Sequence, residues 1–541
     1  MKRILSLAEA GFILLIALAP VFTSFPYRIN IFLSWEGAYR ISQGQIPFKD
    51  FGMPVGYMYW VIPAFFFKLF GMQLITLIKA QAFINIVAGF SFRSIFKSLN
   101  LAPPVLFLTV IVFCLSYSFF NYWPWYNHTV FVYELIALAF LFRYLAASSL
   151  TKWGYLYLVL AGMFVFFSFF TKQDGGGLAF LLCLALLIYH AWISNKWKSL
   201  LIFAGSIVVT GAAIILPLIP YGFGYWFNYG QPPHSSRISA VDIASEFLDA
   251  SLWLKFYLLV TVLLLMSAIK KFKEFFHNKE QMLFTLLTLG ILAQAAIFQV
   301  TSYVPIDNNI YFHSFAFAFI LSWLATRLPI PLHTLKAILT ATTFVFLWWS
   351  AVYWKYIERF IFKPGKENYP YSTYSGYKYA DEVNKNTYLI ELDTSAIPMN
   401  KWRTPNLRSF QKILLPGPTV DGMERLMEMP LVKNNKNLKV LNMTELTPLA
   451  AEMPFELERG SYYPLWFHKG VAMFDKETTL FTGRIQNNHY DLVLFEYIPY
   501  LNNFYPFKIR ENLMACYRKV DSFPAPRNPS AQAWVEVYVK K

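Results

Sequence analysis

Residues 35–71 read WEGAYRISQGQIPFKDFGMPVGYMYWVIPAFFFKLFG, and this stretch decides the fold because it directly follows the first long apolar segment of the chain. It holds two carboxylates, Glu36 and Asp50, among aromatic residues, prolines and glycines. Polar sequence with turn-forming residues between apolar runs is typical of a loop at a membrane surface. We therefore predict that both carboxylates face water just outside a bilayer, where a side chain can take up a proton at the interface.

The composition around this stretch is that of a membrane protein. Of the 541 residues, 56% are hydrophobic and only 14% are charged, whereas soluble domains carry about 25% charged residues. The formal charge of +16 lies largely in short loops between apolar runs, a pattern that membrane orientation explains better than a nucleic-acid-binding surface. The three cysteines are far apart and predict neither a disulfide framework nor a metal cluster.

Apolar segments of about 20 residues recur along the first two thirds of the chain. We predict about eleven transmembrane helices, at roughly 8–27, 74–95, 103–121, 128–146, 153–171, 177–194, 199–218, 251–270, 281–300, 310–326 and 336–354. The N-terminal segment is interpreted as a retained span rather than a cleaved signal peptide. Lys2 and Arg3 then place the N-terminus in the cytoplasm.

The apolar run 54–70 is predicted not to cross the membrane. If it crossed, the cations of several later loops would lie outside, whereas a re-entrant or interfacial run places them all in the cytoplasm, as the positive-inside rule favours. Its prolines, Pro54 and Pro63, and Gly56 are consistent with a broken interfacial helix. The cations in question are Arg93, Lys97, Arg143, Lys152, Lys196, Lys198, Lys270, Lys271, Lys273, Lys279 and Arg327.

The predicted architecture is a polytopic α-helical membrane domain, 1–354, followed by a soluble mixed α/β domain, 355–541, on the extracytoplasmic side. The first extracytoplasmic loop covers about 28–73. After residue 355, no apolar run is long enough to span, and Pro, Asn, Lys and Glu become common. Short β-rich runs are predicted as strands at Leu438–Met443, Asp491–Tyr497, Ala515–Phe523 and Ala533–Val539.

The first loop resembles that of the GT-C glycosyltransferases. Its pattern is an acidic residue before a tyrosine, then G-x-x-P-[YF]-x-D-[FW], then a proline and an aromatic run ending in L-F-G. The nearest likeness is to the family 39 type, which includes protein O-mannosyltransferases and the bacterial aminoarabinose transferase of lipid A. The matching residues are Glu36, Tyr39, Gly44, Pro47, Phe48, Asp50, Phe51, Pro54, Tyr59, Trp60, Leu69, Phe70 and Gly71.

The resemblance implies an inverting glycosyltransferase whose donor is a sugar on a polyprenyl phosphate. Glu36 is then the expected general base, which deprotonates an acceptor hydroxyl as the phosphate departs, and Asp50 its partner. The alternative is that Glu36 is an ordinary solvated loop acid and Asp50 caps the next helix. Two positions depart from the family pattern. Trp35 stands where an Asp is common, and Gly52-Met53-Pro54 replaces Lys-Pro-Pro, so that a phosphate-binding lysine is missing.

Two other cations could hold the donor phosphate. Lys172, in Thr171-Lys172-Gln173-Asp174-Gly175, lies at the outer end of a predicted span next to glycines, where an ammonium group and backbone N–H groups can bind an anion. The alternative is that Lys172 pairs with Asp174. Arg237 is the second candidate, against the alternative of a solvated loop cation.

Four further residues are predicted to line a substrate pocket: Tyr39, His128, Gln173 and His313. The two histidines fall at outer span ends, where a histidine just inside a membrane suggests a polar cavity. A structural role for each histidine, with its hydrogen bonds made inside the protein, is the alternative.

Other chemistries lack a signal in this sequence. There is no nucleotide-binding G-x-x-x-x-G-K-[ST] motif and no zinc motif. We therefore predict no cofactor, with a divalent metal shared by Glu36 and Asp50 left open. The predicted partners are a polyprenyl-phosphate-linked sugar, an acceptor that is a glycan, lipid or protein, and membrane lipids, but no nucleic acid. The predicted location is a bacterial inner membrane. The rival functions are a transporter or flippase of lipid-linked sugars, and a glycan polymerase or ligase.

Overall fold

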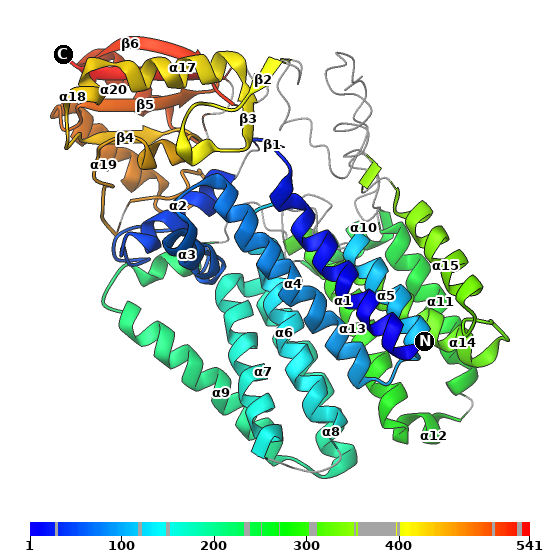
Figure 1. Ribbon diagram of the computed structural model, residues 1–541. Helices are drawn as coiled ribbons and strands as arrows, with labels where there is room; N and C mark the ends of the chain where they lie inside the picture. Colours follow the sequence, from blue (N-terminus) through cyan, green and yellow to red (C-terminus); the bar gives the residue numbers. More distant parts are fainter. Residues whose placement is uncertain are drawn as a thin grey trace.

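The computed structural model describes residues 1–27, 31–116, 122–147, 152–231, 239–249, 251–269, 271–301, 311–350, 353–354, 397, 401–461, 463–499, 502, 504–526 and 533–541. Two parts make up the molecule: a helical bundle, and an α/β unit that lies at one end of it (Figure 1).

Each predicted span overlaps a helix within the described residues. The bundle contains α1 (Lys2–Leu18), α4 (Leu74–Ser98), α5 (Pro103–Ser116), α6 (Tyr126–Ala146), α7 (Lys152–Thr171), α8 (Gln173–Ser194), α9 (Lys198–Ile215), α10 (Ala240–Asp249), α11 (Leu252–Ile269), α12 (Phe272–His277), α13 (Lys279–Thr301), α14 (Phe312–Arg327) and α15 (Leu335–Trp348). Within the described residues, seven helices are long and apolar enough to cross a bilayer, or eight if the bent pair α10 and α11 forms one span. The predicted count of eleven is therefore not reached by length and composition alone.

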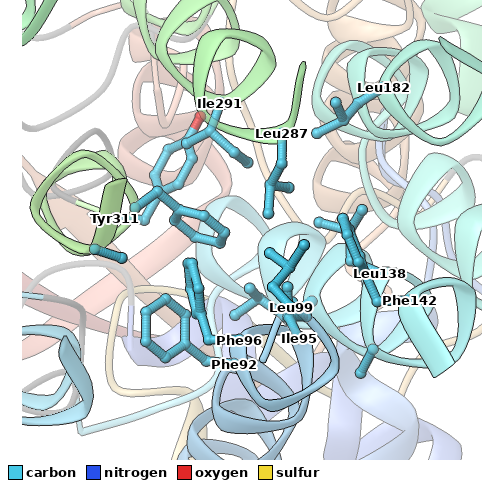
Figure 2. Close-up of a cluster of buried hydrophobic side chains, with 14 of the residues drawn as sticks. Phe92, Ile95, Phe96, Leu99, Leu138, Phe142, Leu182, Leu287, Ile291 and Tyr311 are labelled. Carbon is cyan, nitrogen blue, oxygen red and sulfur yellow. The ribbon is translucent and has the colours of Figure 1, made fainter. Parts of the chain in front are cut away.

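The core of the bundle is built from α4, α6, α8 and α13. Figure 2 shows Phe92, Ile95 and Phe96 of α4 facing Leu138 and Phe142 of α6, with side chains of α8 and α13 closing the cluster. The ring of Phe92 also stacks on Phe113 of α5, with 4.1 Å between the centroids. Such interlocking of large side chains fixes how the helices stand relative to one another.

The run predicted not to cross forms a short helix, α3 (Met58–Phe70), which starts and ends on the side of the α/β unit. At its start, the Tyr133 hydroxyl donates to the Met58 carbonyl at 3.0 Å. Beyond its end, the Met72 carbonyl accepts from the indole of Trp35 at 3.2 Å, on helix α2 (Ile31–Ser42) of the same loop. Thirteen helical residues span only about 20 Å, less than the thickness of a hydrocarbon core.

At the opposite end of the bundle, the turn between α4 and α5 lies close to α12, α13 and α14, with Lys271 and Arg327 beside it. There Asn100 donates to Glu280 at 2.7 Å and Arg327 donates to the Leu264 carbonyl at 3.2 Å. Helix α12 lies at this end of the bundle, away from the α/β unit (Figure 1). A cavity of 590 Å³ opens between the α4–α5 turn, α12, α13 and α14. The side of the membrane that this end faces stays a prediction of the positive-inside rule.

The α/β unit contains the four predicted strands, in a sheet of order β4-β5-β7-β6. These are β4 (Val440–Met443), β5 (Leu492–Tyr497), β6 (Tyr517–Pro524) and β7 (Trp534–Lys540), of which β4 and β5 are parallel and the other pairs antiparallel. Its helices are α17 (Gly417–Glu428), α18 (Pro430–Asn434), α19 (Phe474–Gln486) and α20 (Phe507–Cys516).

A second, smaller sheet joins the two parts of the molecule. Strand β1 (Phe25–Pro26), directly after the first span, pairs in parallel with β3 (Ile413–Pro416), which also pairs with β2 (Trp402–Arg403). Phe25, Tyr27 and Trp35 share one hydrophobic core with strands β4, β5 and β7. The first loop is thus packed into the α/β unit rather than standing apart from it.

Candidate functional site

Glu36, the predicted base, lies on α2 and is buried, with 8% of its surface exposed. Its carboxylate Oε1 pairs with Arg40, at 2.9 Å from Nε and 2.8 Å from Nη2. Burial raises the pKa of Glu36, and the charge and hydrogen bond of Arg40 partly offset that rise. The prediction of a water-facing carboxylate at this position is therefore wrong, because the α/β unit covers it.

Arg40 makes further contacts that tie α2 to the α/β unit. Its Nη1 donates to the side chain of Gln45 and to the Glu458 carbonyl, both at 2.8 Å. Its guanidinium lies 4.3 Å from the centroid of the Tyr463 ring. Burial, with the nearby charge of Glu36, raises the pKa of Tyr463 to about 12. Arg40 was not among the predicted site residues, although a carboxylate and an arginine four residues apart are neighbours on a helix.

Asp50 closes a turn of the first loop. Its carboxylate accepts the backbone N–H of Ile46 at 2.7 Å, and its carbonyl accepts from Gly460 of the α/β unit at 2.8 Å. The next helix, α3, starts only at Met58, so the alternative that Asp50 caps that helix is wrong. The side chain of Asp50 remains more open to solvent than that of Glu36.

The first loop crosses the outer end of α7, next to Lys172. A Cβ atom on Gly56 would lie 1.3 Å from the Phe170 carbonyl oxygen, so only glycine fits at this crossing. The ring of Tyr57 meets the ring of Phe170 edge to face at 5.0 Å. Two stretches singled out from sequence, the first loop and the turn at Lys172, are thereby brought together.

Lys172 and Asp174 form an ion pair in the turn between α7 and α8. Their Nζ and Oδ2 atoms are 3.1 Å apart, and the side chains are 13% and 16% exposed. The Lys172 ammonium also lies 4.4 Å from the ring centroid of Phe298 and 6.0 Å from that of Tyr126. Burial lowers the pKa of Lys172, and the charge of Asp174 opposes that effect. The pairing that was the alternative for Lys172 is thus present.

The glycines after Lys172 serve packing. A Cβ on Gly176 would lie 2.1 Å from the backbone of Phe169, so this glycine lets α7 and α8 approach closely. Gly175 packs against Val130 and Phe298, whereas Gly177 has open space beside it. All three lie in the first turns of α8 rather than in a separate phosphate-binding loop.

Gln173 links this turn to a third segment. Its Nε2 donates to the Trp226 carbonyl at 2.8 Å, on the 3-10 helix η3 (Phe223–Gly230) between α9 and α10. The ring of Trp226 lies 5.0 Å from that of Phe170. We call Tyr126, Lys172, Gln173, Asp174 and Phe298, with Gly56, Tyr57 and Trp226 above them, the Lys172 cluster.

The other predicted site residues are not part of the Lys172 cluster. Tyr39 stacks on Trp35 at 4.5 Å, and its hydroxyl donates to the Ala450 carbonyl at 3.3 Å. His313 is buried beside Tyr257, whose hydroxyl lies 2.9 Å from its Nδ1, and near the rings of Trp253 and Trp349. His128 is buried in the first turn of α6, and Arg237 lies outside the described residues.

No three Cys, His, Asp or Glu side chains come together as a metal site within the part of the chain that the structure describes. The Lys172 cluster thus holds a mostly buried cation that is paired with Asp174 and lies close to the rings of Phe298 and Tyr126.

Comparison with known proteins supports the fold. No protein-family model and no curated protein matches this sequence. Among solved structures, ArnT from Cupriavidus metallidurans bound to undecaprenyl phosphate matches with a TM-score of 0.52 and 10% identity, covering 98% of this chain and 97% of that one. The same protein in the apo state matches with a TM-score of 0.50, 11% identity and the same coverage.

A third structure, the Archaeoglobus fulgidus oligosaccharyltransferase in complex with Zn and sulfate, covers 63% of this chain and 51% of that one at 11% identity. Its TM-score of 0.42 is too low to bear on the fold. The likeness to ArnT extends over nearly the whole chain and shows that the two chains share a fold, a polytopic helical membrane domain followed by an α/β unit as predicted.

Proposed function

We propose that this chain, which has the GT-C fold, is an integral membrane glycosyltransferase that takes one sugar from a polyprenyl-phosphate donor. The acceptor binds on the side of the first loop and the α/β unit, which we assign to the outer face of a bacterial inner membrane. The observation that carries the proposal is the crossing of the first loop over the outer end of α7, which brings the predicted glycosyltransferase loop onto the Lys172 turn.

Lys172 is the proposed contact for the donor phosphate. A polyprenyl chain lies in the bilayer with its phosphate at the interface, and Lys172 lies at the end of two apolar helices on the same side as the first loop. An ammonium group forms strong hydrogen bonds with phosphate oxygens. One of the matching ArnT structures holds undecaprenyl phosphate, which supports this class of donor. Arg237 stays a second proposed contact.

The displacement of phosphate by an acceptor hydroxyl needs a general base. Glu36, with Asp50 as its partner, stays the base predicted from the first loop, and inversion at the sugar carbon stays a prediction of the resemblance. In the structure Glu36 is held by two nitrogens of Arg40. To take a proton, Glu36 would have to leave that ion pair. In its present position, the pair of Glu36 and Arg40 links α2 to the α/β unit.

The rival function, transport of lipid-linked sugars, would favour charged groups within spans. Among the described residues, two carboxylates lie in the interior of apolar helices, and each has a partner: Glu9 pairs with Arg93 at 2.6 Å, and Glu134 accepts from Gln294 at 2.7 Å. Both carboxylates have partners inside the protein. Their presence is explained by contacts between helices and does not favour transport.

Turnover by the purified protein in nanodiscs tests the proposal. Polyprenyl-phosphate sugars would be offered with an envelope extract as acceptor, and free polyprenyl phosphate would be measured for wild type, Glu36→Gln and Asp50→Asn. We expect release by wild type. Movement of the intact donor across the bilayer without release would contradict the proposal and favour the transporter.

A further inference from the structure

The cavity at the end of the bundle opposite the α/β unit has no part in the proposed function. It has a volume of 590 Å³ and lies between the turn from α4 to α5 and the helices α12, α13 and α14. Its apolar side chains Leu99, Phe284 and Trp323 are buried, whereas the charged side chains on its rim are exposed to solvent. An apolar floor under a charged rim, at the ends of helices that cross a bilayer, fits an amphiphile with a polar head group.

The rim of this cavity carries charges of both signs in equal number. Its cations are Lys271, directly before α12, and Arg327, the last residue of α14, and its carboxylates are Glu274 of α12 and Glu280 in the first turn of α13. Lys271 and Glu274 lie 3.3 Å apart, with side chains 73% and 72% exposed. A ligand with a single charge would meet as many like charges as opposite ones. The balanced rim therefore favours a ligand with one negative and one positive group.

Arg327 is held in a fixed orientation on this rim. Its guanidinium carbon lies 4.4 Å from the ring centroid of Trp323, and its Nη1 donates to the Leu264 carbonyl at 3.2 Å. These two contacts orient the guanidinium plane and use only part of its five N–H donors. Because a planar fork of N–H groups matches two oxygens of a phosphate, Arg327 is suited to bind the negative group of such a ligand.

Glu280 is the carboxylate with a matching role. Its Oε1 accepts from the side-chain amide of Asn100 at 2.7 Å, which ties the start of α13 to the turn after α4. A carboxylate can accept about four hydrogen bonds, so this contact leaves Glu280 able to bind an ammonium group. The cavity thus combines an oriented donor for a phosphate with an oriented acceptor for an ammonium.

We propose that this cavity binds the head group of a phospholipid that carries both a phosphate and a primary ammonium group, as phosphatidylethanolamine does. The phosphate lies at Arg327, with Lys271 as a second cation. The ammonium lies at Glu280, with Glu274 as a second carboxylate. Since this end of the bundle is the one predicted to face the cytoplasm, the lipid comes from the cytoplasmic leaflet. The inference is independent of the proposed transfer reaction, because it requires only a bilayer around the helices.

Native mass spectrometry of the purified full-length protein tests the assignment. Phosphatidylethanolamine, phosphatidylglycerol and glycerophosphoethanolamine, which is the head group without acyl chains, would each be titrated into wild type, Arg327→Gln and Glu280→Gln. Lys198→Gln and Glu511→Gln, which remove exposed charges outside the cavity, are the matched controls. Wild type and both controls should prefer phosphatidylethanolamine. Arg327→Gln should weaken binding of both lipids, whereas Glu280→Gln, whose amide oxygen can still accept from Asn100, should weaken only phosphatidylethanolamine, by up to about five-fold for one exposed ion pair.

Lys271→Gln covers the case in which Arg327→Gln does not fold, because it removes an exposed cation of the rim and should likewise weaken both lipids. Equal or tighter binding of phosphatidylglycerol by wild type would overturn the assignment of a head group with both charges. Binding of glycerophosphoethanolamine as tight as that of phosphatidylethanolamine would show that the ligand is a soluble phosphate ester and not a lipid. Absence of lipid binding by wild type, or unchanged binding by the folded cavity variants, would overturn the site itself.

Discussion

At the scale of single residues, the pair Glu36 and Arg40 shows what sequence could and could not predict. The motif placed Glu36 at the functional end of the molecule, but its burial depends on Glu458 and Tyr463, which lie more than four hundred residues further along the chain. No local sequence pattern predicts a contact between residues so far apart in the chain. The i,i+4 spacing of the two charges was the one available signal, and it predicts their pairing.

Removing Arg40 should destabilise the protein strongly. In Arg40→Leu the buried Glu36 carboxylate loses its cation, which costs about 3–5 kcal/mol for a buried pair. The double variant Glu36→Gln/Arg40→Leu should recover a large part of that loss, since no buried charge remains. Thermal melting followed by tryptophan fluorescence in detergent would show this. Equal melting temperatures for Arg40→Leu and wild type would show that the pair is not structural.

Glu477 predicts a pH dependence of stability. It is fully buried on α19 and accepts the hydroxyl of Tyr225 on η3, and burial raises its pKa to about 8. Because the folded state holds a proton between the unfolded value of 4.5 and about 8, stability should be highest below that window. It should fall as pH rises through it, by up to about 1.4 kcal/mol per pH unit.

The Glu477→Gln variant isolates this effect, since its amide oxygen can still accept from Tyr225 but does not titrate. Melting temperatures of wild type and Glu477→Gln would be measured from pH 5 to pH 8. As pH rises, the melting temperature of wild type should fall relative to that of the variant. A difference that stays constant with pH would contradict the assignment of a proton to Glu477.

At the scale of elements, the turn between α7 and α8 depends on one glycine and not on its neighbour. Gly176→Ala would place a methyl group 2.1 Å from the backbone of Phe169, which forces α7 and α8 apart and displaces Lys172. Gly177→Ala meets nothing within 4 Å and should stabilise α8 by roughly 0.4–1 kcal/mol. We expect a lower melting temperature and loss of donor turnover for Gly176→Ala only. Similar behaviour of both variants would contradict this packing.

The elements themselves were largely predictable, for a simple physical reason. Long apolar runs must form helices in a bilayer, and short β-rich runs between polar stretches predicted β4, β5, β6 and β7. The strand β1 was missed, because two residues after a span carry no period and acquire their structure from β3. In the same way, η3 becomes part of the candidate site only through Gln173 and Glu477.

At the scale of the whole molecule, the first loop and the α/β unit fold as one body. Gly52 exchanges backbone hydrogen bonds with Tyr463 and Leu465, and the Tyr27 hydroxyl donates to the Glu445 carbonyl. The division of the chain into a membrane part and a soluble part was predictable from composition. That the soluble part covers the candidate catalytic loop was not, because composition says nothing about which surfaces meet.

A chain that ends at residue 400 should therefore not fold as an intact membrane domain. It would expose Phe25, Tyr27 and Trp35, which are buried against the α/β unit, and would leave the Glu36 and Arg40 pair open to water. Size-exclusion chromatography in detergent should show aggregation of the truncated chain. A monodisperse, active truncated protein would contradict the view that the α/β unit completes the site.

The central claim is that a polyprenyl phosphate binds through Lys172 beneath the first loop. Native mass spectrometry of the purified protein with polyprenyl phosphate tests it most directly, comparing wild type with Lys172→Gln and with Lys198→Gln, an exposed lysine at the other end of the bundle. Polyprenol, which lacks the phosphate, is the ligand control. We predict a bound phosphate for wild type and Lys198→Gln, and its loss in Lys172→Gln. Unchanged binding by a folded Lys172→Gln would contradict the account.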